Sequence, residues 1–203
     1  MVDVNAVLPF SFYRRSDVVQ ISKELLGKFL VTEIDGRRTA GMIVETEAYA
    51  GITDRASHAY NGRHSKRTAV MYRAGGVAYV YLIYGMYHLF NIVTNAEGVP
   101  DAVLIRAVEP AEGVEIMLKR RKVKKIDYKL TAGPGRLTRA LGITVAHTGV
   151  PLNGAPIWLE DRRVTVRDDD ITAGPRIGVD YAGSHAELPW RFWIRGNPWV
   201  SKK

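Results

Sequence analysis

Two glutamates and a tyrosine alternate along the segment VETEAY, in which Glu45, Glu47 and Tyr49 are each separated by one residue. Residues at this spacing in a β-strand point to the same side, so the three side chains should share a face. His58 follows nine residues after Tyr49 and could close the same site from the next loop. A carboxylate beside aromatic rings can hold a planar substrate over a general base. The alternative is that the glutamates form the solvated face of an edge strand, and these residues alone favour that simpler interpretation.

The segment AYVYLIYGMYHLFNI contains four of the ten tyrosines in the chain. Gly85, between two runs of strand-forming residues, predicts a β-hairpin whose turn lies near residues 84–87. With a three-residue loop centred on Met86, Tyr81 would lie opposite Asn91 on one face of the hairpin. A ring and an amide held side by side can bind a planar heterocycle.

The tip of this hairpin would expose the side chains of Tyr84 and Met86. Large apolar side chains are unfavourable in water, and on a basic protein such a tip resembles the wedges that proteins insert between stacked bases. The alternative is a hairpin packed against the protein's own core, and the hairpin taken alone favours that alternative.

The composition is that of an ordinary globular protein except for its charge. In 203 residues, 46% are hydrophobic and 25% are charged, and the formal net charge is +8. This excess of positive charge favours a polyanionic partner, either nucleic acid or an anionic membrane surface. The run of cations within residues 119–125 either contacts phosphates or is the solvated face of a helix. The length suits one domain spanning residues 1–203.

The sequence also excludes several function classes. The chain has no cysteine, which excludes disulfides, thiolate zinc sites and cysteine nucleophiles. Its five histidines lack metal-binding spacing and no glycine-rich stretch matches a nucleotide-binding loop, so we expect no metal and no cofactor. No apolar run approaches the roughly 20 residues of a membrane span. The first residues lack the pattern of a secretory signal, so we expect an intracellular protein without a membrane partner.

The expected strands and helices mix without a regular alternation. Helices are expected at residues 16–28, 109–122 and 135–141. Strands are expected at residues 28–34, 40–48, 77–83, 90–94, 102–107, 157–166, 177–179 and 191–194. This order predicts an α+β fold with a largely antiparallel sheet.

Seven segments together resemble the alkyladenine DNA glycosylase family, also called 3-methyladenine or methylpurine-DNA glycosylases. They are IVETEAY at residues 43–49, VLIRAVEP at residues 103–110, and residues 54–58, 79–91, 133–137, 176–179 and 191–201. The resemblance covers the chain from about Leu25 to Ser201. It implies a single compact α+β domain with a curved, largely antiparallel β-sheet and surrounding helices, from which a β-hairpin protrudes into the DNA minor groove.

The resemblance also implies a role for each residue that matches the family's motifs. Glu47 matches the catalytic general base that activates water, and Arg106 matches the arginine beside that water and the target phosphate. Tyr84 matches the intercalating wedge that fills the gap left by a flipped nucleotide. The base pocket is implied for Tyr49, Ala56, His58, Tyr81 and Asn91. Further DNA contacts are implied for Arg63, Met86, Tyr87 and Arg136.

The implied activity is that of a monofunctional DNA glycosylase. Such an enzyme flips alkylated or deaminated purines out of duplex DNA and hydrolyses the N-glycosidic bond, which starts base excision repair. A carboxylate suits this reaction because the sugar develops positive charge as the bond breaks. The implied partner is double-stranded DNA containing damaged purines, and we expect a monomer associated with DNA.

Two other functions fit parts of the sequence. One is a non-catalytic nucleic-acid-binding module that uses the tyrosine-rich hairpin and in which Glu47 is a bystander. The other is a carbohydrate hydrolase that uses Glu45 and Glu47, since two residues on one strand face lie about 7 Å apart, a separation that permits such chemistry. The positive charge and the exposed hairpin tip fit the carbohydrate hydrolase poorly.

Overall fold

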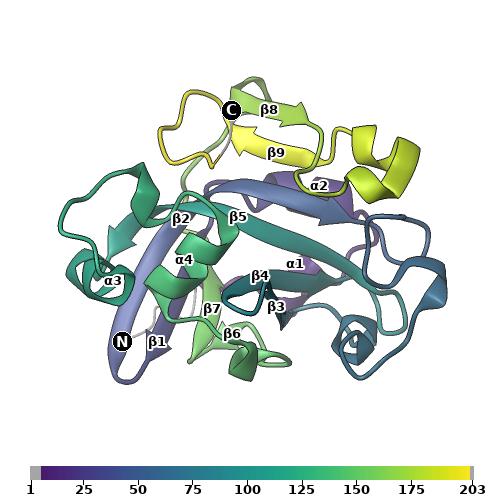
Figure 1. Cartoon of the computed structure of the whole chain (residues 1–203), viewed down its shortest axis with the longest axis horizontal. Coiled ribbons are helices and arrows are strands. Elements are labelled where there is room, and N and C mark those ends of the chain that lie inside the picture. Colours follow the sequence, from purple (N-terminus) through teal and green to yellow (C-terminus); the bar gives the residue numbers. More distant parts are fainter. Residues whose placement is uncertain (1–5, 202–203) are drawn as a thin grey trace.

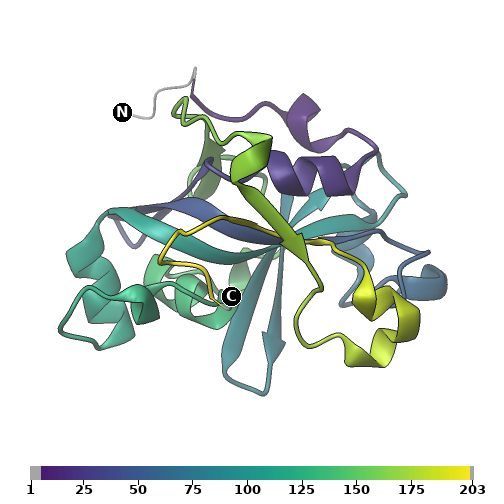
Figure 2. The same cartoon turned by 90° about the horizontal axis from the view of Figure 1, so that it is seen from above.

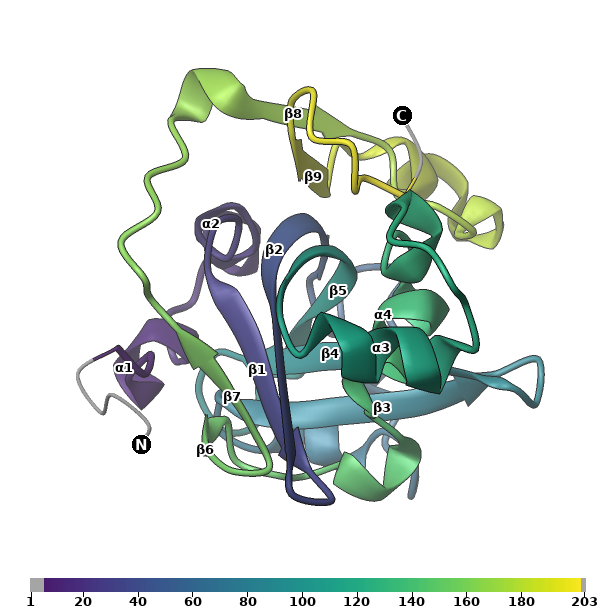
Figure 3. The ribbon, with the colours of Figure 1, turned by 90° about the vertical axis from the view of Figure 1, so that its left-hand side faces the viewer.

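The computed structural model describes residues 6–201, and a nine-stranded β-sheet organises them. The strands are β1 (Phe29–Ile34), β2 (Arg37–Tyr49), β3 (Val77–Ile83), β4 (Tyr87–Thr94), β5 (Asp101–Glu112), β6 (Asn153–Gly154), β7 (Ile157–Glu160), β8 (Ile171–Gly174) and β9 (Arg191–Ile194). Their order is β3-β4-β5-β2-β1-β7-β6, with β9 paired to β2 and β8 paired to β9. All these pairings are antiparallel, and the sheet curves so strongly that β3 and β4 run across the direction of β1 and β2 (Figures 1 and 3).

Four α-helices within the described residues cover the two sides of this sheet. They are α1 (Phe10–Tyr13), α2 (Val18–Glu24), α3 (Val114–Arg121) and α4 (Pro134–Leu141). Figure 2 shows α1 and α2 on one side and α3 and α4 on the other, which is also the side toward which the β3–β4 hairpin projects. Asp17 starts α2 because its carboxylate accepts a hydrogen bond from the backbone N–H of Gln20. The predicted α+β domain with a curved antiparallel sheet is confirmed.

The central strand β5 anchors the hydrophobic core. All its residues from 101 to 108 are buried, since elements pack on both faces of the sheet at this point. Ile105 belongs to one large apolar cluster with Leu25 from the α2 side and Leu137 from α4. Burying a side chain of this size stabilises the fold by roughly 1.5–3 kcal/mol. β5 pairs with β2, so residues on these two strands are held both by the hydrogen bonds of the sheet and by the core.

The hairpin forms as predicted, but its register differs from the expected one. Tyr79 lies opposite Asn91, and Tyr81 lies opposite Leu89, so the prediction that Tyr81 faces Asn91 is wrong by two residues. The reason is that the three-residue loop is centred on Gly85, whose φ of +70° favours glycine. Because side chains alternate with period two, a shift of two residues still leaves Tyr81 and Asn91 on the same face.

The hairpin is packed at its base and exposed at its tip. Tyr79 is buried, whereas Tyr84 is 82% exposed and Met86 is 66% exposed. The interpretation that the hairpin packs entirely on the protein's own core is therefore wrong for the tip. Figure 2 shows the hairpin extending away from the rest of the sheet.

Several predicted element boundaries are also wrong. The helix expected at 109–122 begins only at Val114, because β5 continues through Glu112 and Gly113 then turns the chain with φ +66°. Pro110 lies within β5 beside a register irregularity of β2, a place where a strand tolerates proline. The strand expected at 157–166 ends at Glu160, and residues 177–179 form no strand. The helix expected at 16–28 is the shorter α2.

Candidate active site

Glu47 lies on β2 and is completely buried, and three donors hold its carboxylate. The backbone N–H of Ile177 donates to Oε1 at 2.8 Å, the hydroxyl of Tyr49 donates to Oε2 at 2.8 Å, and Nη1 of Arg106 lies 3.2 Å from Oε1. Charge-assisted contacts of this kind are short and strong, so they fix the position of the carboxylate. Burial, and then the charge of Glu47, raise the pKa of Tyr49 well above its usual value, so Tyr49 stays a neutral donor. Ile177 was expected in a strand, but its N–H serves this carboxylate instead.

Glu45 is buried in the same part of β2, and it anchors Arg106. Its Oε1 accepts from Nε of Arg106 at 3.0 Å and lies 3.2 Å from Nη1 of Arg191, while its Oε2 accepts from the backbone N–H of Ser201 at 2.7 Å. Burial acts to lower the pKa of Arg106, but the charges of Glu47 and Glu45 outweigh burial and raise it. Glu45 therefore neutralises and orients two arginines, which leaves Glu47 as the carboxylate nearest the cavity described next.

A cavity of about 380 Å³ adjoins this pair of glutamates. It is lined by the five residues expected to form a base pocket, namely Tyr49, Ala56, His58, Tyr81 and Asn91, together with Arg106 and Tyr84. Ligand-binding cavities are commonly of about 300–1,000 Å³. Glu47 is not itself part of the lining, but its partners Tyr49, Arg106 and Ile177 are. The structure thus brings the predicted pocket residues together, with Glu47 directly behind their wall.

His58 is fixed in one protonation state by its neighbours. Its Nδ1 lies 2.8 Å from the hydroxyl of Tyr79, and its Nε2 lies 3.3 Å from Nη2 of Arg67. An arginine can only donate, so Nε2 accepts and the proton of the neutral ring resides on Nδ1. Burial, followed by the charges of Arg67 and Arg63, lowers the pKa of His58 to about 4. His58 is therefore a neutral ring that meets Tyr81 edge to face, with centroids 4.6 Å apart.

Asn91 is held rigidly at the floor of the cavity. Its side-chain nitrogen donates to the carbonyl oxygens of Tyr79 at 3.2 Å and Leu89 at 3.4 Å, and the side chain is buried. These two bonds fix the amide in one rotamer, so Asn91 presents a defined shape to whatever enters the cavity.

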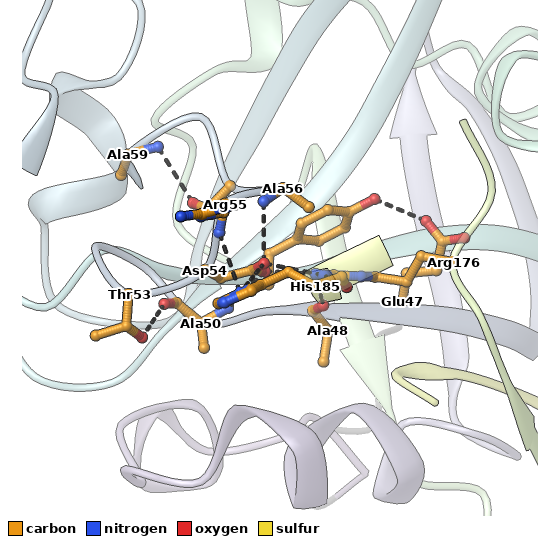
Figure 4. A network of polar contacts seen from close by, with 12 residues as sticks. Glu47, Ala48, Ala50, Thr53, Asp54, Arg55, Ala56, Ala59, Arg176 and His185 are labelled. Carbon is orange, nitrogen blue, oxygen red and sulfur yellow. Dashed lines mark hydrogen bonds and ion pairs between the residues drawn. The ribbon is translucent and has the colours of Figure 1, made fainter. Parts of the chain in front are cut away.

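A buried ion pair behind Tyr49 joins the segments around the cavity (Figure 4). Arg176 contacts Asp54 with both terminal nitrogens, and it also donates to the carbonyl oxygens of Ala48 and His185, each at 2.9 Å. Its guanidinium lies 4.8 Å from the centre of the Tyr49 ring. Both side chains of the pair are fully buried. The pair therefore supports the Tyr49 ring and ties the end of β2 to the C-terminal segment.

The ion pair between Asp54 and Arg176 was not predicted from the sequence. The two residues lie 122 positions apart, and neither has a neighbour at a spacing that signals a site. Arg67 and Tyr181 line the cavity and were likewise missed. Asp54, Arg176 and Tyr181 occur in or beside segments that matched the family, which is the one signal that could have found them, whereas Arg67 lies between two such segments and had no signal.

Four residues predicted to contact DNA lie outside the cavity. Met86 and Tyr87 line a second cavity of about 440 Å³ between the hairpin and α4, and Gly135 at the start of α4 lies directly against Tyr87. Arg136 on α4 donates to the carbonyl oxygen of Ala132, and Arg63 is exposed in the loop before Tyr72. Met86 and Tyr87 therefore lie on the hairpin and Arg136 lies on the neighbouring α4, whereas Arg63 lies in a loop and its charge acts on His58.

Comparison with known proteins identifies the family. The family model described as methylpurine-DNA glycosylase (MPG) matches residues 11–198. Two curated relatives, from Bacillus cereus (strain ATCC 10987 / NRS 248) and Bacillus thuringiensis (strain Al Hakam), are each 49% identical and carry the name "Putative 3-methyladenine DNA glycosylase". Each alignment covers 96% of this chain and 98% of the relative. The chain belongs to the methylpurine-DNA glycosylase family, whose members are hydrolases that cleave N-glycosyl bonds in DNA.

Neither a metal-binding cluster nor a membrane-spanning helix is found among the described residues. Within residues 6–201, no group of three or more histidine, aspartate or glutamate side chains could hold a metal ion. Over the same residues, no helix has the length and apolar character needed to cross a membrane.

Proposed function

We propose that this protein is a monofunctional DNA glycosylase that flips an alkylated or deaminated purine out of duplex DNA and hydrolyses its N-glycosidic bond with a water activated by Glu47. The observation that carries the proposal is the buried Glu47 carboxylate, held by three donors directly behind an aromatic cavity. The family membership and the names of the relatives support DNA carrying damaged purines as the substrate.

The cavity would take the flipped base between aromatic side chains. Tyr49 would stack on one face of the base, with His58 and Tyr81 on the other side. Stacking on an aromatic side chain contributes roughly 1–3 kcal/mol per base and tolerates many ring systems, which suits a site that accepts several lesions. The bulk of Asn91 would disfavour, without excluding, purines that carry an amine on C2, and main-chain groups at Ala56 would meet the base edge.

The hydrolysis would need only water and one carboxylate. The water oxygen bonds to C1′ while the C1′–N9 bond breaks, its proton passes to Glu47, and the electron pair of the broken bond leaves with the purine. The oxocarbenium character of the sugar is stabilised by the Glu47 charge. Tyr49, Arg106 and Ile177 both hold Glu47 and line the cavity, so a small displacement of these groups on DNA binding would admit one water.

The absence of a lysine in the cavity supports the monofunctional assignment. None of the described residues that line it is a lysine, so no amine is available there to form a Schiff base with C1′. The product would be free base and an intact abasic site. A borohydride-trapped adduct between the protein and abasic DNA would contradict this part of the proposal.

The hairpin and the surrounding cations would bind the duplex. Tyr84 would fill the gap left by the flipped nucleotide, and Arg63, Met86, Tyr87 and Arg136 would contact the DNA on either side of the hairpin. Phosphate contacts of this kind supply affinity that does not depend on sequence.

The deciding experiment is base release from duplexes that carry 3-methyladenine, 7-methylguanine, hypoxanthine or ethenoadenine. We expect release by the wild type and a loss of about 100- to 10,000-fold in the single-turnover rate of Glu47→Gln, because general base catalysis contributes that much. Lesion binding by Glu47→Gln should remain within a few fold, since glutamine keeps the shape of the side chain, its oxygen can still accept from Ile177, and the Tyr49 hydroxyl can turn to accept from its amide nitrogen. Glu33→Gln, at an exposed glutamate on β1, is the matched control.

Two outcomes of this experiment would contradict the proposal. If the wild type binds lesion DNA but releases no base, the protein is a non-catalytic binding module. If Glu47→Gln releases base as fast as Glu33→Gln does, another group activates the water.

A further inference from the structure

The buried charges around the cavity cancel in pairs. Arg106 pairs with both Glu45 and Glu47, and Arg191 pairs with Glu45. The nitrogen–oxygen distances in these pairs are 3.0–3.2 Å. Asp54 is matched by Arg176 through the bidentate pair behind Tyr49. These groups surround the site without giving it a net charge.

Arg67 also lines the cavity, and its charge belongs to none of these pairs. Its guanidinium carbon lies 4.9 Å from the centre of the Tyr81 ring, and its Nη2 lies 3.3 Å from Nε2 of the neutral His58. Among the described residues, no carboxylate lies within ion-pair distance of it. The cavity therefore carries one positive charge, and that charge contacts the two rings proposed to face the flipped base.

The backbone that carries Arg67 is held in place. It lies in a tight turn in which the hydroxyl of Thr68 accepts from the backbone N–H of Ser65 at 2.8 Å and donates to the carbonyl oxygen of Arg63 at 3.0 Å. Thr68 is buried at the end of this turn. The position of Arg67 at the cavity is thus set by the fold, while its exposed side chain can adjust to a ligand.

We propose that Arg67 sets the preference of this site between neutral and cationic purine lesions, favouring the neutral ones. The proposal rests on the proposed function, and it assigns to Arg67 a contact with the base rather than with the water. A neutral lesion such as hypoxanthine leaves with the electron pair of the C1′–N9 bond and becomes an anion. The guanidinium stabilises this anion by its charge and by an N–H bond to a ring acceptor, and solvent then protonates the free base.

The same charge has the opposite effect on a cationic lesion. A purine methylated at N7 carries its positive charge before the bond breaks and leaves as a neutral molecule, so it needs no help from a cation. Two like charges at a separation of a few Å repel each other, which weakens binding of the cationic base. Arg67 is exposed, so solvent screens both effects, and we expect each to be worth about three- to tenfold in rate rather than more.

The test compares two lesions in one variant. Single-turnover rates are measured with saturating protein on duplexes that differ only in carrying hypoxanthine or 7-methylguanine. For Arg67→Gln we expect the hypoxanthine rate to fall about three- to tenfold while the 7-methylguanine rate is unchanged or higher. Arg67→Lys keeps the charge but loses the planar set of N–H donors. Its hypoxanthine rate should therefore lie between those of Arg67→Gln and the wild type.

The matched control is Lys66→Gln, which removes the neighbouring exposed cation that does not line the cavity. It should leave the ratio of the two rates unchanged. An equal loss on both lesions in Arg67→Gln would overturn the inference and assign Arg67 to the DNA backbone instead. Thermal unfolding of each variant separates a loss of fold, which would lower both rates together, from a change in selectivity.

Failure of the inference can be distinguished from failure of the proposed function. If the wild type releases neither base, the proposed function is wrong. If the wild type releases both bases and the ratio does not change in Arg67→Gln, the proposed function stands and only the role of Arg67 is wrong.

Discussion

The ring nitrogens of His58 are both engaged, and this arrangement makes the residue sensitive to acid. Tyr79 accepts a hydrogen bond from Nδ1, and Arg67 donates to Nε2, so the imidazolium form could not keep the hydrogen bond from Arg67. Sequence alone predicted that His58 belongs to the site, because it lies in a segment that matched the family. It did not predict the protonation state, which depends on Arg67 and Tyr79 being folded against the ring from two other segments.

We therefore expect His58 to remain neutral down to about pH 4. Burial, and then Arg67 and Arg63, lower the pKa of His58 to about 4 from the ordinary value of 6.5. Below pH 6.5 the unfolded chain binds this proton and the folded protein does not, so stability present above pH 6.5 is lost as the pH falls toward 4. The loss is up to about 3 kcal/mol.

Two measurements check this expectation. An NMR titration of the imidazole should give a midpoint near pH 4, and urea unfolding at pH 7 and pH 5 should show a smaller loss of stability in His58→Gln than in the wild type. An NMR midpoint near 6.5, or equal losses in the two proteins, would contradict it.

At the scale of elements, the sequence predicted most strands and the hairpin, but not the contacts between distant segments. Alternation and turn residues are local signals, so β3 was predicted with its observed bounds and the hairpin turn within one residue. The end of β5 was missed because Pro110 is a helix-start signal in sequence, whereas pairing with β2 keeps it in a strand. The pair of Asp54 and Arg176 has no local signal at all, since it forms only when β2 and the C-terminal segment fold together.

The exposed tip of the hairpin leads to a prediction about base flipping. Tyr84 is 82% exposed, so Tyr84→Ala should change the free energy of unfolding by less than about 0.5 kcal/mol. In the Glu47→Gln background, it should reduce the population of flipped ethenoadenine about tenfold, because a stacking side chain no longer fills the gap. The fluorescence of ethenoadenine in duplex DNA reports this population. Tyr128→Ala, at a half-exposed tyrosine after α3, is the control, and an equal effect of both changes would argue against a wedge.

Over the whole molecule, the cations divide into two groups. On the side of α1, α2 and β7, several pair with carboxylates: Arg15 with Glu24, Lys28 with Asp161, and Arg162 with Glu160. On the side of the hairpin, burial and then the charges of Arg136 and Arg139 lower the pKa of Arg121, which indicates crowded positive charge. Figure 2 shows that α3 and α4 flank the hairpin on this side. Positive charge is thus crowded on the two helices beside the hairpin.

The cationic run that the sequence left ambiguous can be tested by the salt dependence of binding. Lys122, Lys124 and Lys125 are exposed, and within the described part of the chain they have no carboxylate at ion-pair distance. If they bind phosphates, replacing all three by glutamine should reduce the slope of log K against log salt by about 0.9 for each phosphate that is no longer neutralised. Single-turnover rates at saturating protein should not change, because none of the three lines the cavity.

The control removes the same charge from the opposite side of the molecule. Arg14, Arg163 and Arg167 are exposed near α1 and the segment after β7, away from the hairpin, and their triple glutamine variant has the same net charge as the lysine variant. A reduced slope in the lysine variant alone would extend the DNA path from the hairpin across the loop after α3. Equal slopes in the two variants would mean that the run is a solvated surface, and that the net charge of +8 acts on DNA only through the general field of the protein.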